Sequence, residues 1–588
     1  MNVPFNSPSP ILDLSDSELR NAVKDRTEKN LLCLLDKLSS TVFYKESSAL
    51  AALRDAKESR ANGDGELQHF FSTVPFTSYD DYSPFVSRFF AQPCGKSAVD
   101  NLLAPGLPLF LAHTSGTSGS APKYFPKYPS PQFTRSPWNS PDAPKISMCG
   151  FNSLRISRLV EIVDEDKQLV ADLPVTIISS GGLRYYLGIE PRDDDKILDQ
   201  KVWFLPSYQS NIFMNSFFAL TDPSIIFMNA TLSTILYDAI RIIEENWDMM
   251  IKAIEQGILP EVDGLGGYRK HLEPFVEPNP TRATELSQIE VGSPGWLKKV
   301  WPSLVVIRVT LSGQYSSLEP KRIQCLRQAV LQLRYHFGPT VSLQSVIFSA
   351  TECMVGFGYD ANNTNLYRLD SNEHIEFLDV QQERSPDNLL QPWETKCGNK
   401  YEIFVTTHDG LWRYALNDIV EVAGYSPIDG QPLIKYCERK GVGFRVAGEF
   451  VSESELQKVV ASLSETLGQV LEFTTEIDNR RSGVLGSYGF FVELASDTGP
   501  SPNSPVKTVQ DALLKNPGYK KYFEGGFIGT PTIRVVAPGT FKAYRDWRIQ
   551  RTGFTVGQVK VPITIVDPET KDWLLGKVTS ELQSDFAA

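Results

Sequence analysis

The run HTSGTSGSAPKYFP, residues 113–126, is the most informative stretch of this sequence. Hydroxyl residues alternate with glycines, and Lys123 follows shortly after the last glycine. Glycines let backbone N–H groups approach an anion closely, and the hydroxyls and the lysine provide further donors. The run therefore predicts a loop that cradles a polyphosphate, although a flexible Ser/Gly turn explains its composition equally well.

Two better-known loop motifs do not fit this run. A Walker A loop needs G-K-[ST] in tandem, whereas Lys123 stands between Pro122 and Tyr124. Ser120 and Lys123 spell S-x-x-K, but neither S-D-N nor K-T-G follows anywhere in the chain. A P-loop NTPase and a β-lactamase-like nucleophile are thus disfavoured.

Two acidic residues downstream are candidate ligands. Glu352 closes SATE, directly after the predicted strand VSLQSVIF, where an open α/β sheet binds its ligands and where a carboxylate can hold Mg²⁺. Asp418 lies in TTHDGLWRYALNDIVEV, which predicts strand, turn and strand, and can accept the two hydroxyls of a ribose. A helix cap for Glu352 and turn stabilisation for Asp418 are the ordinary alternatives.

The roles of two further polar residues, Lys560 and His408, are less clear from their neighbours in sequence. Lys560 in GQVKVP is either a surface lysine whose stem covers apolar neighbours or a cation delivered to developing negative charge. His408 has no Ser or Cys nucleophile motif beside it, so we expect a structural role.

The apolar periodicity predicts helices interleaved with strands. Helices are expected over residues 15–38, with Ser15 and Glu18 as a capping box, over 229–259 up to Gly257, and over 320–336 up to Gly338. The proline-rich segment 122–144 predicts a long surface loop without regular structure. Strands are predicted over residues 304–311, 341–348, 375–380, 401–407 and 419–424, which indicates an α/β body.

The pattern changes after Tyr436. Residues 437–460 predict a polar hairpin that leads into a helix, and 497–505 predict a loop. We therefore place a boundary near Glu438, between a body of residues 1–438 and a smaller carboxy-terminal domain of residues 439–588.

Composition narrows the functional classes. The chain has 588 residues, 41% of them hydrophobic, with 58 Lys and Arg against 70 Asp and Glu and a formal net charge of −12. Such a balance disfavours binding to nucleic acid or to an anionic membrane surface. The dispersed cysteines, the absence of a signal-like start and the absence of a run of about 18 apolar residues predict a cytoplasmic protein.

Taken in order along the chain, these motifs resemble those of adenylate-forming enzymes, and most closely the auxin-responsive (Gretchen Hagen) acyl-acid amido synthetases. The resemblance extends from about residue 75 to residue 562. It includes stretches without catalytic duty, namely EENWDMMIKAIEQGIL, WPSLVVIRVTLSG and GFIGTPTIRVVAPGTF. It implies an adenylate-forming fold with a large amino-terminal α/β body and a smaller, mobile α+β carboxy-terminal domain.

The resemblance also implies roles for single residues. The run HTSGTSG is similar to the family's nucleotide loop, so the ATP phosphates are expected on Ser115, Gly116, Thr117 and Ser118. The segment FSATE is similar to Y-x-S-S-E, which places Phe348, Ser349, Ala350 and Thr351 near the adenine and α-phosphate and Glu352 on Mg²⁺. By the same resemblance Tyr367 lies beside the nucleotide, Asp418 binds the ribose, and Lys560 is the lysine of the mobile domain.

The sequence departs from the family's R-Y-R-x-G-D pattern at two positions. Ala415 replaces an arginine, which removes a charge near the nucleotide, and Asn417 replaces a glycine. Asparagine tolerates left-handed backbone angles better than most residues, so we expect the turn to keep its shape.

The implied reaction activates a carboxylic acid with Mg-ATP to an acyl-adenylate and transfers the acyl group to an amine such as an amino acid. The apolar helices between residues 154 and 258 are expected to line the acyl pocket, and the small domain to close about Arg439 and Lys440. Two alternatives remain: an acyl-CoA ligase that forms a thioester, and a nucleotide-binding homologue without turnover. The sequence identifies neither the acid, nor the amine, nor the oligomeric state.

Overall fold

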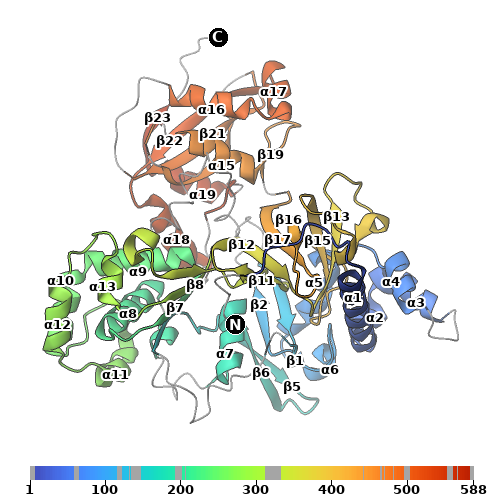
Figure 1. The fold of residues 1–588 in the computed structure, drawn as a ribbon, viewed down its shortest axis with the longest axis horizontal. Coiled ribbons are helices and arrows are strands. Elements are labelled where there is room, and N and C mark those ends of the chain that lie inside the picture. The colour runs from blue at the N-terminus through green and yellow to red at the C-terminus, as the bar shows by residue number, and fades with distance from the viewer. Residues whose placement is uncertain are drawn as a thin grey trace. The chain divides into compact units, whose positions relative to one another are not determined.

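The structure, a computed structural model, describes residues 7–58, 65–114, 122–131, 133, 147–192, 201–205, 207–311, 333–441, 443–463, 466–468, 470–480, 483–495, 504–552, 561–565 and 567–582. These residues form two compact units, one drawn from residues up to Cys437 and the other chiefly from Glu438 onward (Figure 1). Strands and helices interleave along the chain, which confirms the predicted α/β class. Among the described helices, none is long and apolar enough to cross a bilayer.

A five-stranded mixed sheet in the first unit contains the strands on either side of the hydroxyl/glycine run. Its order is β1 (Cys94–Gly95), β5 (Arg158–Val163), β6 (Leu169–Thr176), β2 (Phe110–His113) and β3 (Tyr124–Lys127). Helix α7 (Ile178–Leu187) packs closely on β2, because a Cβ atom on Gly181 would lie only 2.4 Å from the Phe110 ring.

Strand β3 corrects the prediction of an irregular loop over residues 122–144. It pairs antiparallel with β2 and lies at the edge of the sheet, with Pro126 opposite Leu111. A proline has no N–H to donate, so a strand can contain one where an edge leaves one side without a partner. Residues 132 and 134–146 of the predicted loop lie outside the described residues.

An eight-stranded sheet is the widest sheet of the described residues. Its strand order is β10 (Ile347–Ser349), β11 (Met354–Asp360), β12 (Asn363–Leu369), β17 (Pro432–Arg439), β16 (Tyr414–Tyr425), β15 (Lys400–Thr406), β13 (His374–Asp379) and β14 (Leu389–Leu390). The strands predicted over residues 375–380 and 401–407 are therefore present. The one predicted over 419–424 begins earlier, at Tyr414.

The first unit also contains a four-stranded parallel sheet, on which helices pack. Its order is β4 (Met148–Phe151), β7 (Phe227–Leu232), β8 (Val306–Thr310) and β9 (Ser342–Gln344). The single strand predicted over residues 341–348 is thus two strands, β9 and β10, in different sheets. Helix α8 (Tyr208–Thr221) packs on β4, and α9 (Ser233–Glu245) packs on β7 (Figure 1).

The helix predicted over residues 229–259 is three elements instead of one. Residues at its start belong to β7, and a break at Asn246 separates α9 from α10 (Trp247–Gln256). The predicted end is correct, because Gly257 caps α10 with a left-handed φ of 66°. Of the helix predicted over 320–336, only residues 333–336 are described; these are helical, and Gly338 follows at a φ of 79°.

Helix α1 (Ser17–Leu38) joins the amino-terminal segment to the eight-stranded sheet. Its N-cap is Asp16, whose carboxylate accepts from the backbone N–H groups of Glu18 and Leu19, so the capping box predicted on Ser15 is wrong. Arg26 of α1 donates to the Asp429 carbonyl at 2.9 Å. Just before the helix, the backbone of Ile11 pairs with that of Tyr425.

Short helices complete the first unit. They are α2 (Val42–Glu46), α3 (Ala51–Glu58), α4 (Glu66–Thr73), α5 (Tyr79–Val86), α6 (Lys96–Val99), α11 (Arg269–Leu272), α12 (Pro280–Ser287) and α13 (Trp296–Val300). A large apolar core gathers side chains from α1 to α6, from the five-stranded sheet and from the eight-stranded sheet, including the fully buried Phe43, Phe89 and Trp412.

The second unit has the hairpin and helix that the sequence predicts. Strands β18 (Gly443–Phe444) and β19 (Val451–Ser452) pair antiparallel and lead into α15 (Glu453–Ser462). A four-stranded sheet follows, in the order β20 (Val470–Asp478), β21 (Gly486–Leu494), β22 (Ile528–Val536) and β23 (Val578–Leu582). Its other helices are α16 (Pro505–Leu513), α17 (Pro517–Glu524), α18 (Thr540–Thr552) and α19 (Pro568–Leu575).

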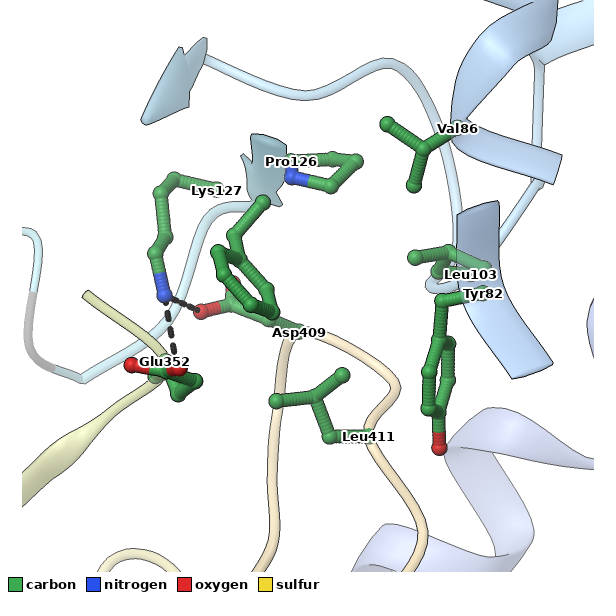
Figure 2. Close-up of a pocket in the computed structure, with 9 residues that line it drawn as sticks. Tyr82, Val86, Leu103, Pro126, Lys127, Glu352, Asp409 and Leu411 are labelled. Carbon is green, nitrogen blue, oxygen red and sulfur yellow. Dashed lines mark hydrogen bonds and ion pairs between the residues drawn. The ribbon is translucent and has the colours of Figure 1, made fainter. Parts of the chain in front are cut away.

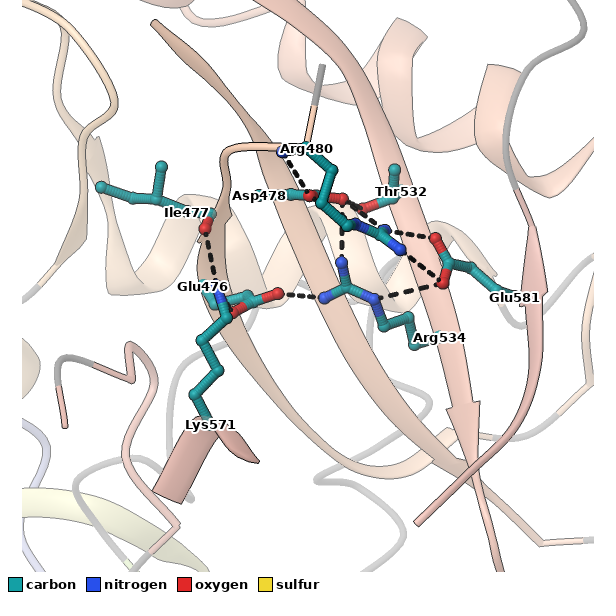
Figure 3. A network of polar contacts seen from close by, with 8 residues as sticks. All are labelled: Glu476, Ile477, Asp478, Arg480, Thr532, Arg534, Lys571 and Glu581. Atoms are coloured by element: carbon teal, nitrogen blue, oxygen red, sulfur yellow. Dashed lines mark hydrogen bonds and ion pairs between the residues drawn. The ribbon is translucent and has the colours of Figure 1, made fainter. Parts of the chain in front are cut away.

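A buried polar network ties β20, β22 and α19 together (Figure 3). The Arg534 guanidinium pairs with both Glu476 and Asp478, and Lys571 Nζ lies 2.7 Å from Glu476 Oε2. Burial disfavours the charged form of Asp478, but hydrogen bonds from Arg480 and Thr532 outweigh it and lower the pKa of that carboxyl. Asp478 therefore stays charged at neutral pH, and its contacts help to hold this side of the sheet together.

Candidate active site

The β2–β3 hairpin positions the two ends of the hydroxyl/glycine run. The Thr114 N–H donates to the Lys123 carbonyl at 2.9 Å, and the Lys123 N–H donates to Thr114 Oγ1 at 3.1 Å. These two bonds hold the ends of the loop beside each other at the end of the hairpin. The predicted phosphate ligands Ser115, Gly116, Thr117 and Ser118 lie between them, outside the described residues.

His113, the last residue of β2, directly precedes this loop. Its side chain is buried, and its Nε2 lies 3.1 Å from Ser157 Oγ. Burial lowers the pKa of His113 below its ordinary value, so the ring is neutral at pH 7. A neutral histidine in this place anchors the end of the strand and adds no charge beside the loop.

Glu352 lies in the turn that joins β10 to β11. The Ala350 N–H closes this turn by donating to the Cys353 carbonyl at 2.9 Å. Glu352 is only 5% exposed. Among the residues that the structure describes, no hydrogen bond or ion pair reaches its carboxylate, so the predicted alternative of a helix cap does not apply.

Aromatic side chains surround the start of the same turn. The Phe348 ring centroid lies 5.6 Å from that of Tyr367 and 5.6 Å from that of Tyr436. Tyr367 is fully buried, and its hydroxyl donates to the Thr364 carbonyl at 2.9 Å. Ser349 is exposed, whereas Ala350 and Thr351 are half-buried. The exposed side of this segment is thus Ser349 to Thr351, while Tyr367 supports Phe348 from within.

A buried ion pair lies against the Glu352 turn (Figure 2). Lys127 Nζ donates to the Glu352 carbonyl at 2.8 Å and to Asp409 Oδ2 at 2.9 Å. The side chains of Lys127 and Asp409 are 1% and 6% exposed. Apolar side chains, Phe125 among them, and Tyr82 line the rest of this region, and the two charged side chains have little contact with water.

Asp418 lies inside β16 at an irregularity of the sheet, not at the end of a turn. Phe404 is opposite Ala415, and Glu402 is opposite Ile419, so β16 carries a bulge between these pairs. Asn417 within the bulge has a φ of 61°, which is the left-handed conformation expected of it. Asp418 is 6% exposed. Ala415 is buried beside Leu378 and Phe404, so the position of the missing arginine is filled by apolar packing.

His408 and Arg413 belong to the framework of the β15–β16 connection. The His408 N–H donates to Glu373 Oε2 at 2.8 Å, and its ring faces the same carboxylate. Arg413 forms a two-pronged pair with Glu376, with N–O distances of 2.8 and 2.9 Å. The Arg413 pair is buried and the His408 contact is partly buried, and both help to fix the turn that precedes Asp418.

In the second unit, Lys560 lies outside the described residues, but the residues directly after it are held on the edge of β20. Thr475 exchanges backbone bonds with this segment: its N–H donates to the Ile563 carbonyl at 2.8 Å, and its carbonyl accepts from Ile565 at 2.7 Å. The Thr475 hydroxyl adds a bond to the Ile563 carbonyl at 2.6 Å.

The structure packs Phe348 against Tyr367, places Glu352 in the turn directly after β10, and places Asp418 on the same eight-stranded sheet. It also reveals Lys127 and Asp409, which the sequence analysis missed. Lys127 lies in the proline-rich stretch that predicts a surface loop, and Asp409 lies beside His408 in a turn whose sequence carries no signal for an ion pair. The aromatic pair Tyr124 and Phe125 after Pro122 was the available signal for a buried strand.

Comparisons with known proteins agree with this arrangement. The sequence model of the GH3 family N-terminal domain matches residues 18–321, that of the GH3 family central domain matches 367–439, and that of the GH3 family C-terminal domain matches 454–569.

Curated relatives cover most of this chain. A protein of Oryza sativa subsp. japonica, named probable indole-3-acetic acid-amido synthetase GH3.4, is 25% identical over 87% of this chain and 83% of its own length. Indole-3-acetic acid-amido synthetase GH3.15 of Arabidopsis thaliana is 23% identical over 95% of this chain and 96% of its own length. A solved structure titled GH3.15 acyl acid amido synthetase superposes with a TM-score of 0.72 at 19% identity and covers 99% of both chains, and so shares this fold.

Proposed function

Because this chain belongs to the GH3 family, we propose that it is an ATP-dependent acyl acid amido synthetase that joins a small carboxylic acid to the amine of an amino acid. The observation that carries the proposal is the match of all three family domains in their order along one chain. The names of the relatives support the same reaction, since they are acid-amido synthetases.

The proposed reaction has two balanced steps. A carboxylate oxygen of the acid attacks the α-phosphorus of ATP, the bond from that phosphorus to the bridging oxygen breaks, and pyrophosphate leaves. The amine nitrogen then attacks the acyl carbon of the adenylate, AMP leaves with the former carboxylate oxygen, and the nitrogen loses a proton. The first step brings two anions together, so it needs positive charge and hydrogen-bond donors at their meeting point.

The chain provides these groups from separate segments. In the proposal, Ser115, Gly116, Thr117 and Ser118 donate to the phosphates, and the exposed Ser349–Thr351 stretch, backed by Phe348 and Tyr367, faces the adenine and the α-phosphate. Asp418 accepts the ribose hydroxyls. Lys560 adds a cation at the α-phosphate, brought to the body of residues 1–438 by the domain of residues 439–588.

The Glu352 site fits a magnesium ion held mainly by its substrate. The Glu352 carboxylate is buried and receives no donor from the described residues. Within the same residues no cluster of three or more His, Cys, Asp or Glu side chains is arranged to hold a metal. Magnesium is commonly bound by one or two carboxylates, phosphate oxygens and water, which matches a single glutamate beside a triphosphate. When bound, the ion would neutralise charge on the phosphates.

Ala415, which replaces the arginine of the family pattern, does not by itself favour the alternative of a nucleotide-binding protein without turnover. Ala415 is packed into a small apolar cluster, and the bulge that carries Asp418 keeps its left-handed residue. The backbone that carries Asp418 is thus compatible with the proposed ribose contact, although one cation of the family pattern is missing.

A screen for products tests the proposed function. Purified protein is incubated with Mg-ATP and a matrix of carboxylic acids and amino acids, in parallel with and without coenzyme A, and AMP and the conjugates are measured by mass spectrometry. The acids include indole-3-acetic acid and 2,4-DB, because relatives carry the first in their names and a related solved structure is titled as a complex with the second. We expect AMP in equal amount to an amide for at least one pair. A thioester formed with coenzyme A in place of any amide, or no AMP from any pair, would overturn the proposal.

A further inference from the structure

Lys127 is a buried cation that reaches the main chain of a proposed metal-binding residue. It lies at the end of the edge strand β3, and its Nζ donates to the Glu352 carbonyl at 2.8 Å (Figure 2). The same ammonium donates to Asp409 Oδ2 at 2.9 Å. Its contacts therefore join the hairpin that carries the phosphate loop, the Glu352 turn and the connection between β15 and β16.

Asp409 is itself fixed on both sides. Its second oxygen, Oδ1, accepts from the Tyr128 N–H at 2.8 Å, so the carboxylate is bound to two consecutive residues of the same segment. The next residue, Gly410, has a φ of 89°, and a Cβ atom there would lie 1.9 Å from the Leu103 carbonyl oxygen. Only glycine fits this approach, and it holds the turn in one place against the body.

Stability alone does not explain this arrangement. An ammonium buried at 1% exposure loses its hydration, and replacing a buried ion pair by apolar side chains of similar size is often neutral or stabilising. A methionine would fill the position of Lys127 without that cost. The ammonium does something that a methionine cannot, which is to fix the direction of the Glu352 carbonyl and thereby the turn from which the Glu352 side chain projects.

We propose that Lys127 and Asp409 are positioning residues that hold the Glu352 turn in the orientation that binds the magnesium–nucleotide complex. This inference rests on the proposed function, in which Glu352 is the protein ligand of that ion. Partners that orient a metal ligand from behind commonly change metal affinity by about 10–100-fold when they are removed.

The test measures metal binding directly, apart from turnover. Mn²⁺ replaces Mg²⁺ as a paramagnetic probe and is titrated by electron paramagnetic resonance in the presence of α,β-methylene-ATP, which is not cleaved at the α-phosphate. The wild type is compared with Lys127→Met, Asp409→Asn, the double variant and Glu352→Gln. Lys298→Met is the matched control, because Lys298 Nζ also donates to a main-chain carbonyl, that of Leu304 at 2.6 Å, away from this site.

We expect Lys127→Met to weaken Mn²⁺–nucleotide binding by about 10–100-fold, while Lys298→Met leaves it unchanged. Thermal unfolding without nucleotide separates positioning from folding. Asp409→Asn leaves the buried ammonium without its counter-charge and lowers the melting temperature most, and the double variant recovers much of this loss. The double variant still binds Mn²⁺ as weakly as Lys127→Met, because neither residue then directs the turn.

Two results would overturn the inference. One is a folded Lys127→Met variant with wild-type Mn²⁺ affinity, and the other is a double variant that recovers both melting temperature and affinity. Glu352→Gln separates this failure from that of the proposed function. If Glu352→Gln loses Mn²⁺–nucleotide binding and Lys127→Met does not, only the positioning role is wrong. If Glu352→Gln binds like the wild type, or the wild type binds no Mn²⁺–nucleotide, the assignment of Glu352 fails and the positioning role with it.

Discussion

Lys560 carries the sharpest expectation for a single residue. If it stabilises the charge that develops at the α-phosphate, Lys560→Ala should slow adenylation by about 100-fold or more, which is the usual effect of removing one preorganised donor. The measurement is the release of pyrophosphate with a saturating acid and no amine. Unchanged release would contradict the assignment. Lys515→Ala is a suitable comparison, since that lysine is exposed on the second unit.

The backbone angle of Asn417, in the bulge of β16, predicts how substitutions there change stability. A left-handed φ of 61° costs an ordinary side chain about 1–2 kcal/mol, and glycine much less. Asn417→Ala should therefore lower the free energy of unfolding by about 1 kcal/mol, whereas Asn417→Gly should stay near the wild type. Urea unfolding of the two variants gives the comparison. Equal stability of both would show that the bulge does not need this backbone angle.

Single residues were predictable from the sequence where the chemistry of the side chain and the local sequence pattern point to the same role. Glu352 follows a strand and is buried without a donor among the described residues, and Asn417 has the predicted backbone angle. Lys127 and Asp409 could not be found in this way. They lie 282 positions apart in sequence, and only the packing of two sheets makes them partners.

Among the elements, α1 offers a direct test of a helix cap. Asp16 accepts from the backbone N–H groups of Glu18 and Leu19 at 2.8 and 3.3 Å, whereas Ser15 lies outside the helix. Asp16→Ala should cost about 1 kcal/mol of stability, and Ser15→Ala should cost almost nothing. Chemical unfolding followed by circular dichroism measures both. The reverse order would restore the capping box that the sequence predicted on Ser15.

The elements that the sequence misjudged share a physical cause, which is that tertiary context decided them. Prolines argue against a strand only where its N–H groups are needed, and the edge position of β3 removes that need. Apolar residues at helical spacing continue from β7 into α9, so periodicity alone does not separate a buried strand from the helix that follows it. The end of α10 at Gly257 was predictable because local backbone chemistry sets it.

For the molecule as a whole, the Arg413–Glu376 pair predicts how stability depends on pH. Burial disfavours the Glu376 carboxylate, but Arg413 and His374 outweigh it and lower its pKa from 4.5 to about 2. A carboxyl whose pKa falls on folding stabilises the folded state above pH 4.5, and this contribution disappears as the pH drops towards 2. It is on the order of 3 kcal/mol for this shift.

The matching experiment compares unfolding of the wild type and Glu376→Gln between pH 7 and pH 3. Burial raises the pKa of the nearby Glu373, which acts in the opposite sense, so the difference between the two proteins isolates Glu376. We expect the wild type to lose stability more steeply below pH 4.5 than the variant. If the stability of both proteins fell equally with pH, the pKa of Glu376 would not differ between the folded and unfolded states.

The pairing of the first strand-like residues and α1 with the last strands of the first unit has a consequence for biosynthesis. Ile11 and Arg26 contact Tyr425 and Asp429, and the second of these contacts spans 403 positions. A ribosome that adds about 5–20 residues per second needs roughly 20–80 s to supply those partners. Through that interval the part of this segment that those strands later cover has no partner, although α4 can already pack on α1.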